Sequence, residues 1–345
     1  MKSSVFNGKE FDIVEQDIPE LLEGEVLIKN SACGICGSDI GRAKNGEAQP
    51  GKVLGHEFSG KIININGSSG SFQIGDKVIG AVHAPCYTCH ECLRGHTTKC
   101  EKWNKYNINP GGFSEYFKVS INLLERTFFR IPENVSLEKA TLGEPIACCI
   151  RAQKLVNHNP GDNVLIIGAG TIGNIHLCLS RLKQPGKVIV TDISNEKLEL
   201  SSNIGADYTI NNKENNLKKK VLDLTEGFGP DIIYVCAPVP ELITEAVELV
   251  RNGGAVCVFA PVYNNNVPID SMRLINNEIK VFGTYSLDPS NLGEALVLLD
   301  QKLIPSELFL THEFPLVNFN EAFENAQIDV GKDGNVSLKT LIKFD

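Results

Sequence analysis

Residues 163–192 carry the clearest pattern of apolar and polar positions in the chain. Val164–Ile167 is a short apolar run rich in β-branched residues, which predicts a buried strand. After a glycine-rich turn, Ile175–Arg181 continues at helical spacing, and Val188–Val190 is a second apolar run of strand type. Strand, turn, helix and strand therefore follow one another, as in a βαβ unit with parallel strands.

On either side of this unit the pattern indicates other kinds of structure. Short apolar runs divided by turns fill residues 1 to about 120, which favours an all-β, barrel-like unit. Helical periodicity takes over from about 137 to 157, and strands and helices then alternate as in a doubly wound parallel sheet. Beyond 287 a helical stretch precedes the strand-like VSLKTLIKF, which we expect to return to the first unit because the parallel sheet is already complete.

The glycine-rich turn also indicates a binding function. It runs Gly168-Ala169-Gly170-Thr171-Ile172-Gly173. Gly168 permits the sharp turn, Gly170 the approach of a pyrophosphate to the backbone, and Gly173 close packing of the helix, whose first N–H groups attract phosphates. Asp192 follows about 20 residues on, where an acid accepts hydrogen bonds from ribose hydroxyls and repels a 2′-phosphate. The pattern predicts a dinucleotide site that favours NAD over NADP; the alternative is a glycine turn in some other α/β protein.

The composition of the chain argues against several classes of binding partner. The 345 residues suffice for two domains, and 42% of them are hydrophobic, as in ordinary globular proteins. A formal net charge of −9 leaves no basic field for nucleic acid or an anionic membrane surface. No run of about 18 apolar residues could span a bilayer, and the N-terminus lacks the apolar core of a signal peptide. Eleven cysteines then suggest reduced thiols and metal ligation, so we expect a cytoplasmic protein with no nucleic-acid or membrane partner.

Four of these cysteines are closely spaced: Cys86, Cys89, Cys92 and Cys100. Thiolates at this spacing can converge on one tetrahedral ion and suit zinc, and four sulfur ligands leave no position for a substrate. We therefore predict a structural zinc site, with an iron–sulfur cluster as the alternative. The nearby His83, His90 and His96 are expected to be surface residues.

Several motifs together resemble one family. They are GICGSD, GHEFSG, GDKVIGAV, the four-cysteine stretch, GEP, IIGAGTIG and VTDIS. Their order is similar to that of the zinc-dependent medium-chain dehydrogenase/reductase family, closest to its sorbitol or polyol branch. The resemblance implies an α/β protein with a GroES-like β-rich barrel catalytic domain at 1–152. It also implies an NAD-binding Rossmann domain, a doubly wound parallel sheet, at 153–286, and a return segment at 287–345 that completes the first domain.

The resemblance also implies a second zinc ion, held in a catalytic site. Cys36 and His56 would bind the ion directly, and Glu57 would be a carboxylate able to approach it. Glu144 stands where the polyol branch has its acidic ligand, bound directly or through water. Asp39 would bond the far nitrogen of His56 and fix its tautomer. One thiolate, one imidazole and carboxylate leave a position open for a substrate, as a catalytic zinc requires.

Further positions match the family's catalytic and cofactor residues. Ser38 matches the hydroxyl that starts the proton relay, Lys197 the basic contact to the adenosine ribose, and Phe282 a backbone contact to the nicotinamide amide. Gly41 stands where many relatives carry a relay histidine, and Arg42 where sorbitol dehydrogenases often have tyrosine. Arg42 could contact a phosphate or carboxylate, although an exposed arginine is the plainer interpretation. These departures put sorbitol itself in doubt.

The resemblance therefore implies an oxidoreductase that transfers a hydride between NAD and a secondary alcohol, with zinc as Lewis acid. The expected substrate is a polyol, a sugar alcohol with or without a phosphate, or a cyclitol, and a homodimer or homotetramer is expected. A threonine-type or aminocyclitol dehydrogenase is one alternative. A zinc- and nucleotide-binding protein without catalysis is another.

Overall fold

The computed structural model describes residues 1–263 and 266–344 and divides into two compact units. The first comprises Met1–Cys148 together with the chain from Ser286 onward, and the second comprises Cys149–Tyr285. Each unit has its own buried apolar core. No helix among the described residues is both long and apolar enough to cross a bilayer.

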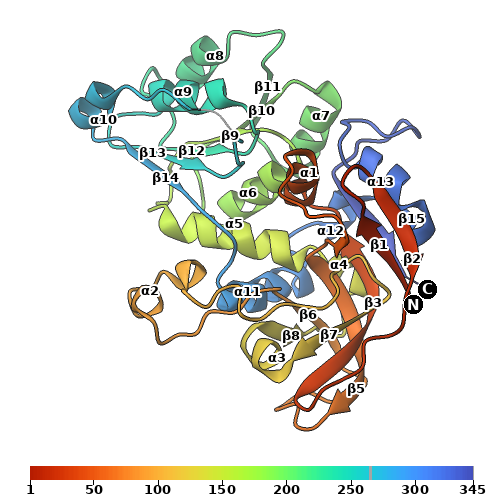
Figure 1. Ribbon diagram of the computed structural model, residues 1–345. Helices are drawn as coiled ribbons and strands as arrows, with labels where there is room; N and C mark the ends of the chain where they lie inside the picture. Colours follow the sequence, from red (N-terminus) through yellow and green to blue (C-terminus); the bar gives the residue numbers. More distant parts are fainter. Residues whose placement is uncertain (264–265, 345) are drawn as a thin grey trace. The chain divides into compact units, whose positions relative to one another are not determined.

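The second unit is built on a six-stranded parallel sheet (Figure 1). Its strands, in spatial order, are β11 (Tyr208–Asn211), β10 (Val188–Asp192), β9 (Val164–Ile167), β12 (Ile232–Val235), β13 (Ala255–Val258) and β14 (Lys280–Gly283). Its helices are α6 (Thr171–Arg181), α7 (Asn195–Ile204), α8 (Leu217–Leu224), α9 (Pro240–Leu249) and α10 (Ser271–Asn277). The order reverses between β9 and β12, which confirms the predicted doubly wound sheet.

Alternation along the central strand explains why both faces of this sheet are covered. Leu165 and Ile167 belong to one core cluster, with side chains of α8 and α9, whereas Val164 and Ile166 belong to another, with side chains of α6 and α7. Successive side chains of a strand point to opposite faces. A continuous apolar run such as Val164–Ile167 is therefore buried on both sides.

The first unit is rich in antiparallel strands. A three-stranded sheet joins β2 (Phe11–Glu15), β1 (Lys2–Phe6) and β4 (Lys52–Val53). The larger sheet contains β15 (Leu310–Pro315), β16 (Lys339–Lys343), β3 (Glu25–Gly34), β5 (Glu57–Asn66), β6 (Lys77–Gly80) and β8 (Phe128–Arg130), with β7 (Tyr116–Ser120) also paired to β3. Its helices are α1 (Gly37–Lys44), α2 (His90–Leu93), α3 (Ile121–Thr127), α4 (Leu137–Ala140), α11 (Pro289–Asp300), α12 (Ser306–Phe309) and α13 (Phe319–Asn325), with 3₁₀ turns at Thr97–Lys99 and Leu316–Asn318. α5 (Gly143–Leu155) begins in this unit.

Two strand pairings bring distant segments together in the first unit. β3 pairs antiparallel with β5, with Gly34 opposite Glu57. β16 pairs antiparallel with the end of β3, with Leu341 opposite Gly34 and Ile342 opposite Cys33. The residues just after β3, at the start of β5 and at the start of β16 therefore lie close together, and they supply Cys36, Asp39, His56, Glu57 and Lys339.

Candidate active site and metal centres

Cys36 and His56 are brought together by the β3–β5 pairing. Cys36 is the N-cap of α1: its Sγ atom accepts a hydrogen bond from the Ser38 backbone N–H at 3.5 Å, and its own N–H donates to the Asp39 carboxylate at 3.3 Å. His56 directly precedes β5. The ligand atoms of Cys36, His56 and Glu57 lie within 4.8 Å of one another. A thiol, an imidazole and a carboxylate at this spacing fit one zinc ion.

Asp39 fixes the orientation of the His56 ring. Its buried carboxylate lies 3.4 Å from Nδ1 of His56 and accepts a bond from the Gly55 N–H at 3.4 Å. Burial opposes protonation of His56, but the Asp39 charge and hydrogen bond outweigh it, and the pKa of His56 is raised well above 6.5. In the neutral ring, a proton held on Nδ1 by Asp39 leaves the lone pair of Nε2 available to a metal.

Glu57 is held by a lysine that sequence analysis did not identify. Nζ of Lys339, at the start of β16, donates to the two carboxylate oxygens of Glu57 at 2.7 and 2.9 Å and to the backbone oxygen of Ile35 at 3.3 Å. Both side chains are almost fully buried, with 6% of Lys339 and 1% of Glu57 exposed. Burial lowers the pKa of Lys339, but the negative charge of Glu57 more than offsets this effect. The pKa is therefore raised above its usual value of 10.5, and the lysine is charged. No motif surrounds Lys339 in sequence, and only the pairing of β16 with β3 reveals it.

Glu144 lies in the first turn of α5 and is near this group without belonging to it. Its carboxylate accepts a hydrogen bond from Sγ of Cys148 at 3.4 Å. Burial raises the pKa of Glu144, and the charges of His56, Glu57 and Lys339 act on it as well. The group of ligand atoms that converge within 4.8 Å at this centre consists of those of Cys36, His56 and Glu57 and does not include Glu144. A role for Glu144 as a metal ligand stays a prediction.

Ser38 lies beside the His56 ring, and His83 lies within reach of the charge of His56. Oγ of Ser38 lies 3.5 Å from Nε2 of His56. His83 is partly buried, with an Nδ1 atom that has no hydrogen-bond partner, and its ring packs against Trp103 with centroids 5.5 Å apart. Burial, then the positive charges of His56 and Arg42, lower the pKa of His83 to about 4. His83 is thus only partly exposed, whereas His90 and His96 are exposed, as expected.

The four-cysteine stretch forms a small lobe of its own. The sulfur atoms of Cys86, Cys89, Cys92 and Cys100 lie within 4.8 Å of one another. Backbone N–H groups donate to the sulfurs of Cys86 and Cys100. Hydrogen bonding to Thr88 lowers the pKa of the Cys86 thiol to about 5, while burial raises the pKa of Cys92 to about 12. Trp103 is the only other buried side chain of the lobe's core cluster. Four convergent sulfurs fit a structural zinc ion, and so small a core needs one.

The glycine turn has the geometry that a dinucleotide needs. Gly168 has φ +107°, and a Cβ at Gly173 would lie 1.8 Å from the Gly168 oxygen, so the start of α6 packs directly on the turn. A Cβ at Gly170 would meet nothing within 4 Å, which leaves the backbone open to an approaching group. Gly170 is also the N-cap of α6 and has no side chain to cap the first N–H groups of the helix, which is the arrangement found where helix N-termini bind phosphates.

Asp192 ends β10 beside this turn. Its carboxylate accepts hydrogen bonds from the N–H groups of Ala169 at 2.7 Å, Ile193 at 2.7 Å and Ser194 at 3.0 Å. Lys197 lies in the first turn of α7, and Phe282 lies in β14 at the edge of the sheet. The structure therefore brings Asp192 to the glycine turn, as the motif predicted, and leaves the contacts of Lys197 and Phe282 with a cofactor as predictions.

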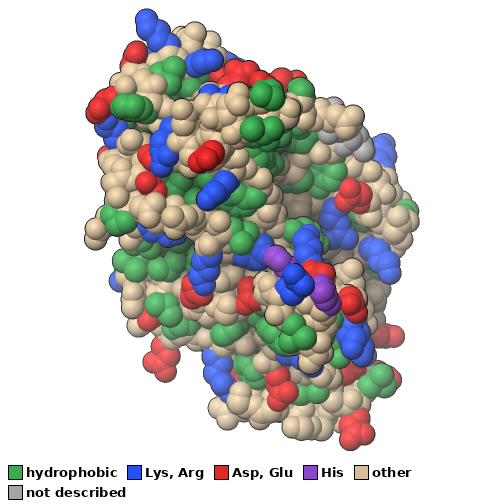
Figure 2. Space-filling model, turned by 90° about the vertical axis from the view of Figure 1, so that its left-hand side faces the viewer, with side chains coloured by type: hydrophobic (Ala, Val, Ile, Leu, Met, Phe, Trp, Pro, Cys, Tyr) green, Lys and Arg blue, Asp and Glu red, His purple; other side chains and the backbone are tan. Residues whose placement is uncertain are grey.

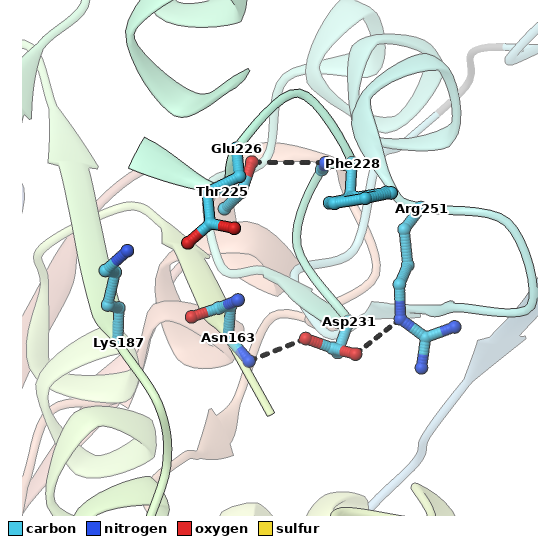
Figure 3. Close-up of a pocket in the computed structure, with 8 residues that line it drawn as sticks. Asn163, Lys187, Thr225, Glu226, Phe228, Asp231 and Arg251 are labelled. Atoms are coloured by element: carbon cyan, nitrogen blue, oxygen red, sulfur yellow. Dashed lines mark hydrogen bonds and ion pairs between the residues drawn. The ribbon is translucent and has the colours of Figure 1, made fainter. Parts of the chain in front are cut away.

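A cavity in the second unit lies at the other end of its sheet (Figure 3). Asn163, Lys187 and Asp231 line it, and each directly precedes a parallel strand, whereas the glycine turn follows the carboxyl end of β9. The Asp231 carboxylate accepts from the Asn163 N–H at 2.7 Å and pairs with Arg251. Ligands of such sheets bind at the carboxyl ends of the strands, so this cavity is not the predicted dinucleotide site.

The surface agrees with the charge of the sequence. Figure 2 shows Lys and Arg side chains interspersed with Asp and Glu side chains over one face of the molecule, without a continuous basic field on that face. Nucleic acid binding depends on such a field. This face offers none.

A parallel sheet with a dinucleotide turn, joined to a β-rich unit with a thiolate–imidazole centre and a four-cysteine lobe, defines the class of zinc-containing, nucleotide-dependent dehydrogenases. Comparisons with known proteins agree. Residues 22–132 match the alcohol dehydrogenase GroES-like domain, and residues 172–301 match the zinc-binding dehydrogenase domain. The chain belongs to the zinc-dependent medium-chain dehydrogenase family, whose members are oxidoreductases acting on CH–OH groups.

Individual relatives cover nearly the whole chain at modest identity. Sorbitol dehydrogenase of Bacillus subtilis is 28% identical over 94% of this chain and 93% of its own. D-arabitol-phosphate dehydrogenase of Enterococcus avium is 29% identical over 96% of this chain and 93% of its own. The crystal structure of galactitol-1-phosphate dehydrogenase from Escherichia coli superposes with a TM-score of 0.88 at 28% identity, covering 99% of this chain and 100% of that one.

Proposed function

We propose that this protein is a zinc-dependent oxidoreductase that transfers a hydride between NAD and a secondary alcohol. The substrate is a polyol, a sugar alcohol with or without a phosphate, or a cyclitol. The observation that carries the proposal is the convergence of Cys36, His56 and Glu57, with Asp39 holding the imidazole. Relatives named for sorbitol and for arabitol phosphate support the polyol class.

The first unit supplies both metal sites in this proposal. Cys36, His56, Glu57 and Glu144 serve the catalytic zinc, with Glu57 or Glu144 bound directly or through water. Cys86, Cys89, Cys92 and Cys100 hold the structural zinc. When bound at the first site, zinc acts as a Lewis acid that stabilises negative charge on the alcohol oxygen. The domain boundaries proposed for these roles are 1–152 with 287–345 for zinc and substrate, and 153–286 for NAD.

Ser38 handles the proton. Its hydroxyl lies 3.5 Å from Nε2 of His56, the nitrogen that Asp39 leaves available. It is therefore within reach of the alcohol proton at the same centre. Gly41, one helical turn further along α1, offers no side chain to pass that proton on. We propose that the proton leaves Ser38 through water.

The glycine turn and Asp192 hold the cofactor. Gly168, Gly170, Thr171, Ile172 and Gly173 place backbone N–H groups against the pyrophosphate. The Asp192 carboxylate retains acceptor capacity for ribose hydroxyls and repels a 2′-phosphate, which favours NAD. Lys197 contacts the adenosine ribose and Phe282 contacts the nicotinamide through its backbone.

The proposal extends to assembly and location. β14 is an edge strand, and α10, which precedes it, has no buried residue and exposes Met272 and Ile275. An open strand edge beside exposed apolar side chains favours pairing with a second copy, which supports a homodimer or homotetramer. None of the eleven cysteines forms a disulfide, which supports a reducing compartment such as the cytoplasm.

The test is NADH formation across polyols, phosphorylated polyols, cyclitols, aminocyclitols and threonine, with NAD and NADP, before and after chelation. We expect NAD-linked turnover of one polyol or cyclitol class that chelation abolishes and zinc restores. Turnover confined to threonine or to aminocyclitols would select the amino-alcohol alternative. Two bound zinc ions with no alcohol turnover would select the non-catalytic alternative.

A variant pair tests the relay within the same assay. Ser38→Ala should lower kcat by about 100-fold or more while the zinc content stays unchanged. Ser71→Ala, at an exposed loop position, is the matched control and should leave kcat unchanged. Unchanged turnover of Ser38→Ala would remove Ser38 from the relay.

A further inference from the structure

Arg42, which pairs with no carboxylate in the described part of the chain, lies one helical turn from the proposed relay residue. Arg42 is four residues after Ser38 and three after Asp39 in α1. Residues at these spacings lie on the same side of a helix. Ser38 and Asp39 both contact the His56 ring, so the side of α1 that carries Arg42 is the side that faces the catalytic centre.

The Arg42 guanidinium is available to a ligand. Among the described residues no carboxylate pairs with it, although the chain carries more acidic than basic residues. Arg42 is exposed, and its charge acts on the ring of His83 together with the charge of His56. His56 and Arg42 therefore both lie within Coulombic reach of His83.

His83 supplies a second polar atom at this place. Its Nδ1 atom is buried from water and has no hydrogen-bond partner. The ring is held by Trp103, whose centroid lies 5.5 Å from that of His83. A buried imidazole nitrogen without a partner costs free energy, so such an atom beside a catalytic centre points to a ligand that completes its bonding.

We propose that Arg42 forms an anion subsite that binds a phosphate or carboxylate group carried by the alcohol substrate, with Nδ1 of His83 accepting a hydrogen bond from a hydroxyl of the same substrate. This inference rests on the proposed function, because it assigns one end of the substrate whose carbinol reacts at Cys36 and His56. A guanidinium fork binds either anion through paired charge-assisted hydrogen bonds. The long arginine side chain, one turn of about 5.4 Å from Ser38, places the anion several bonds from the reacting carbon.

Matched substrate pairs test this subsite. D-arabitol, D-arabitol phosphate and D-arabinonate are compared with NAD and the zinc-loaded enzyme, and galactitol with its 1-phosphate. We expect a kcat/KM at least about 10-fold higher for an anionic member than for its neutral partner. Arg42→Gln should lower kcat/KM about 10- to 100-fold for that anionic substrate alone, and Arg42→Lys by less. The phosphate and the carboxylate arms show which anion is bound.

Control variants and a binding measurement separate this inference from the proposed function. Lys44→Gln removes a cation from the same end of α1 and should change kcat/KM for neither the anionic nor the neutral substrates. Isothermal titration with glycerol 1-phosphate, glycerate and glycerol needs no turnover. Binding of an anion but not of glycerol, abolished in Arg42→Gln and weakened in His83→Phe, supports the subsite even if no tested alcohol is oxidised. Equal kcat/KM for neutral and anionic alcohols, or anion binding unchanged in Arg42→Gln, would overturn it and leave the proposed function standing.

Discussion

The buried pair of Lys339 and Glu57 gives the most specific stability prediction. Lys339→Met keeps most of the length of the side chain but removes its charge. Glu57 then loses two hydrogen bonds of 2.7 and 2.9 Å while 99% of its side chain stays away from water. Removing one partner of a buried ion pair costs about 3–5 kcal/mol, because the remaining charge is unpaired. We expect that loss in the chelated protein and a smaller one in the zinc-loaded protein, where a divalent cation lies near the carboxylate.

Hydrogen exchange of the β16 amides is the assay, because it reports the local free energy of opening and does not require the two units to unfold together. The double variant Lys339→Met/Glu57→Gln should recover most of the loss, because no unpaired charge is left, and the cycle should give a coupling of about 2 kcal/mol or more. Lys343→Met, at a more exposed pair in the same strand, should cost less than about 1 kcal/mol. A Lys339→Met protein within 1 kcal/mol of wild type, or a double variant no better than the single one, would refute the reasoning.

Three further predictions concern other parts of the chain. Trp103 is the only tryptophan and is buried against the four-cysteine lobe, so removal of zinc from that lobe, or Cys100→Ser, should shift its fluorescence to longer wavelength. Asp192→Asn should lower the preference for NAD over NADP in kcat/KM by about 10-fold, because the charge that repels a 2′-phosphate is lost. His176 is fully buried, and burial lowers its pKa from 6.5 to about 3. Between these pH values only the unfolded chain binds the proton, so the free energy of unfolding should fall as pH is lowered from 6.5 toward 3, by up to about 1.4 kcal/mol per pH unit. His176→Gln should make that dependence shallower in urea unfolding of the chelated protein.

Each of these has a matched control. Cys178→Ala removes a buried thiol from α6 and should leave the Trp103 emission in place. Asp223→Asn removes an exposed charge from α8 and should leave the coenzyme preference unchanged. His90→Gln changes an exposed histidine and should keep the wild-type pH dependence. Three results would contradict the respective arguments. They are a Trp103 emission wavelength that does not change on chelation, an unchanged NAD preference in Asp192→Asn, and an unchanged pH dependence of the free energy of unfolding in His176→Gln.

Much of the second unit was predictable because its signals are local. The apolar run Val164–Ile167, the glycines and Asp192 lie within one short βαβ segment, where turn geometry and strand alternation act between neighbours. The four-cysteine lobe was readable for the same reason, since its sulfurs are close in sequence and converge without help from the rest of the fold. In both places the spacing of residue types is itself the structural constraint.

The catalytic centre depended on tertiary structure. Cys36 and His56 lie on different segments and meet because β3 pairs with β5. Lys339 reaches Glu57 across 282 residues of sequence because β16 joins the end of β3, and no periodicity specifies such a pairing. The partial burial of His83 was likewise decided by packing against Trp103. Local patterns determined the elements and the short motifs of this protein, whereas burial and charge at its active centre were decided by strands that are distant in sequence, because pairing energies depend on the whole fold.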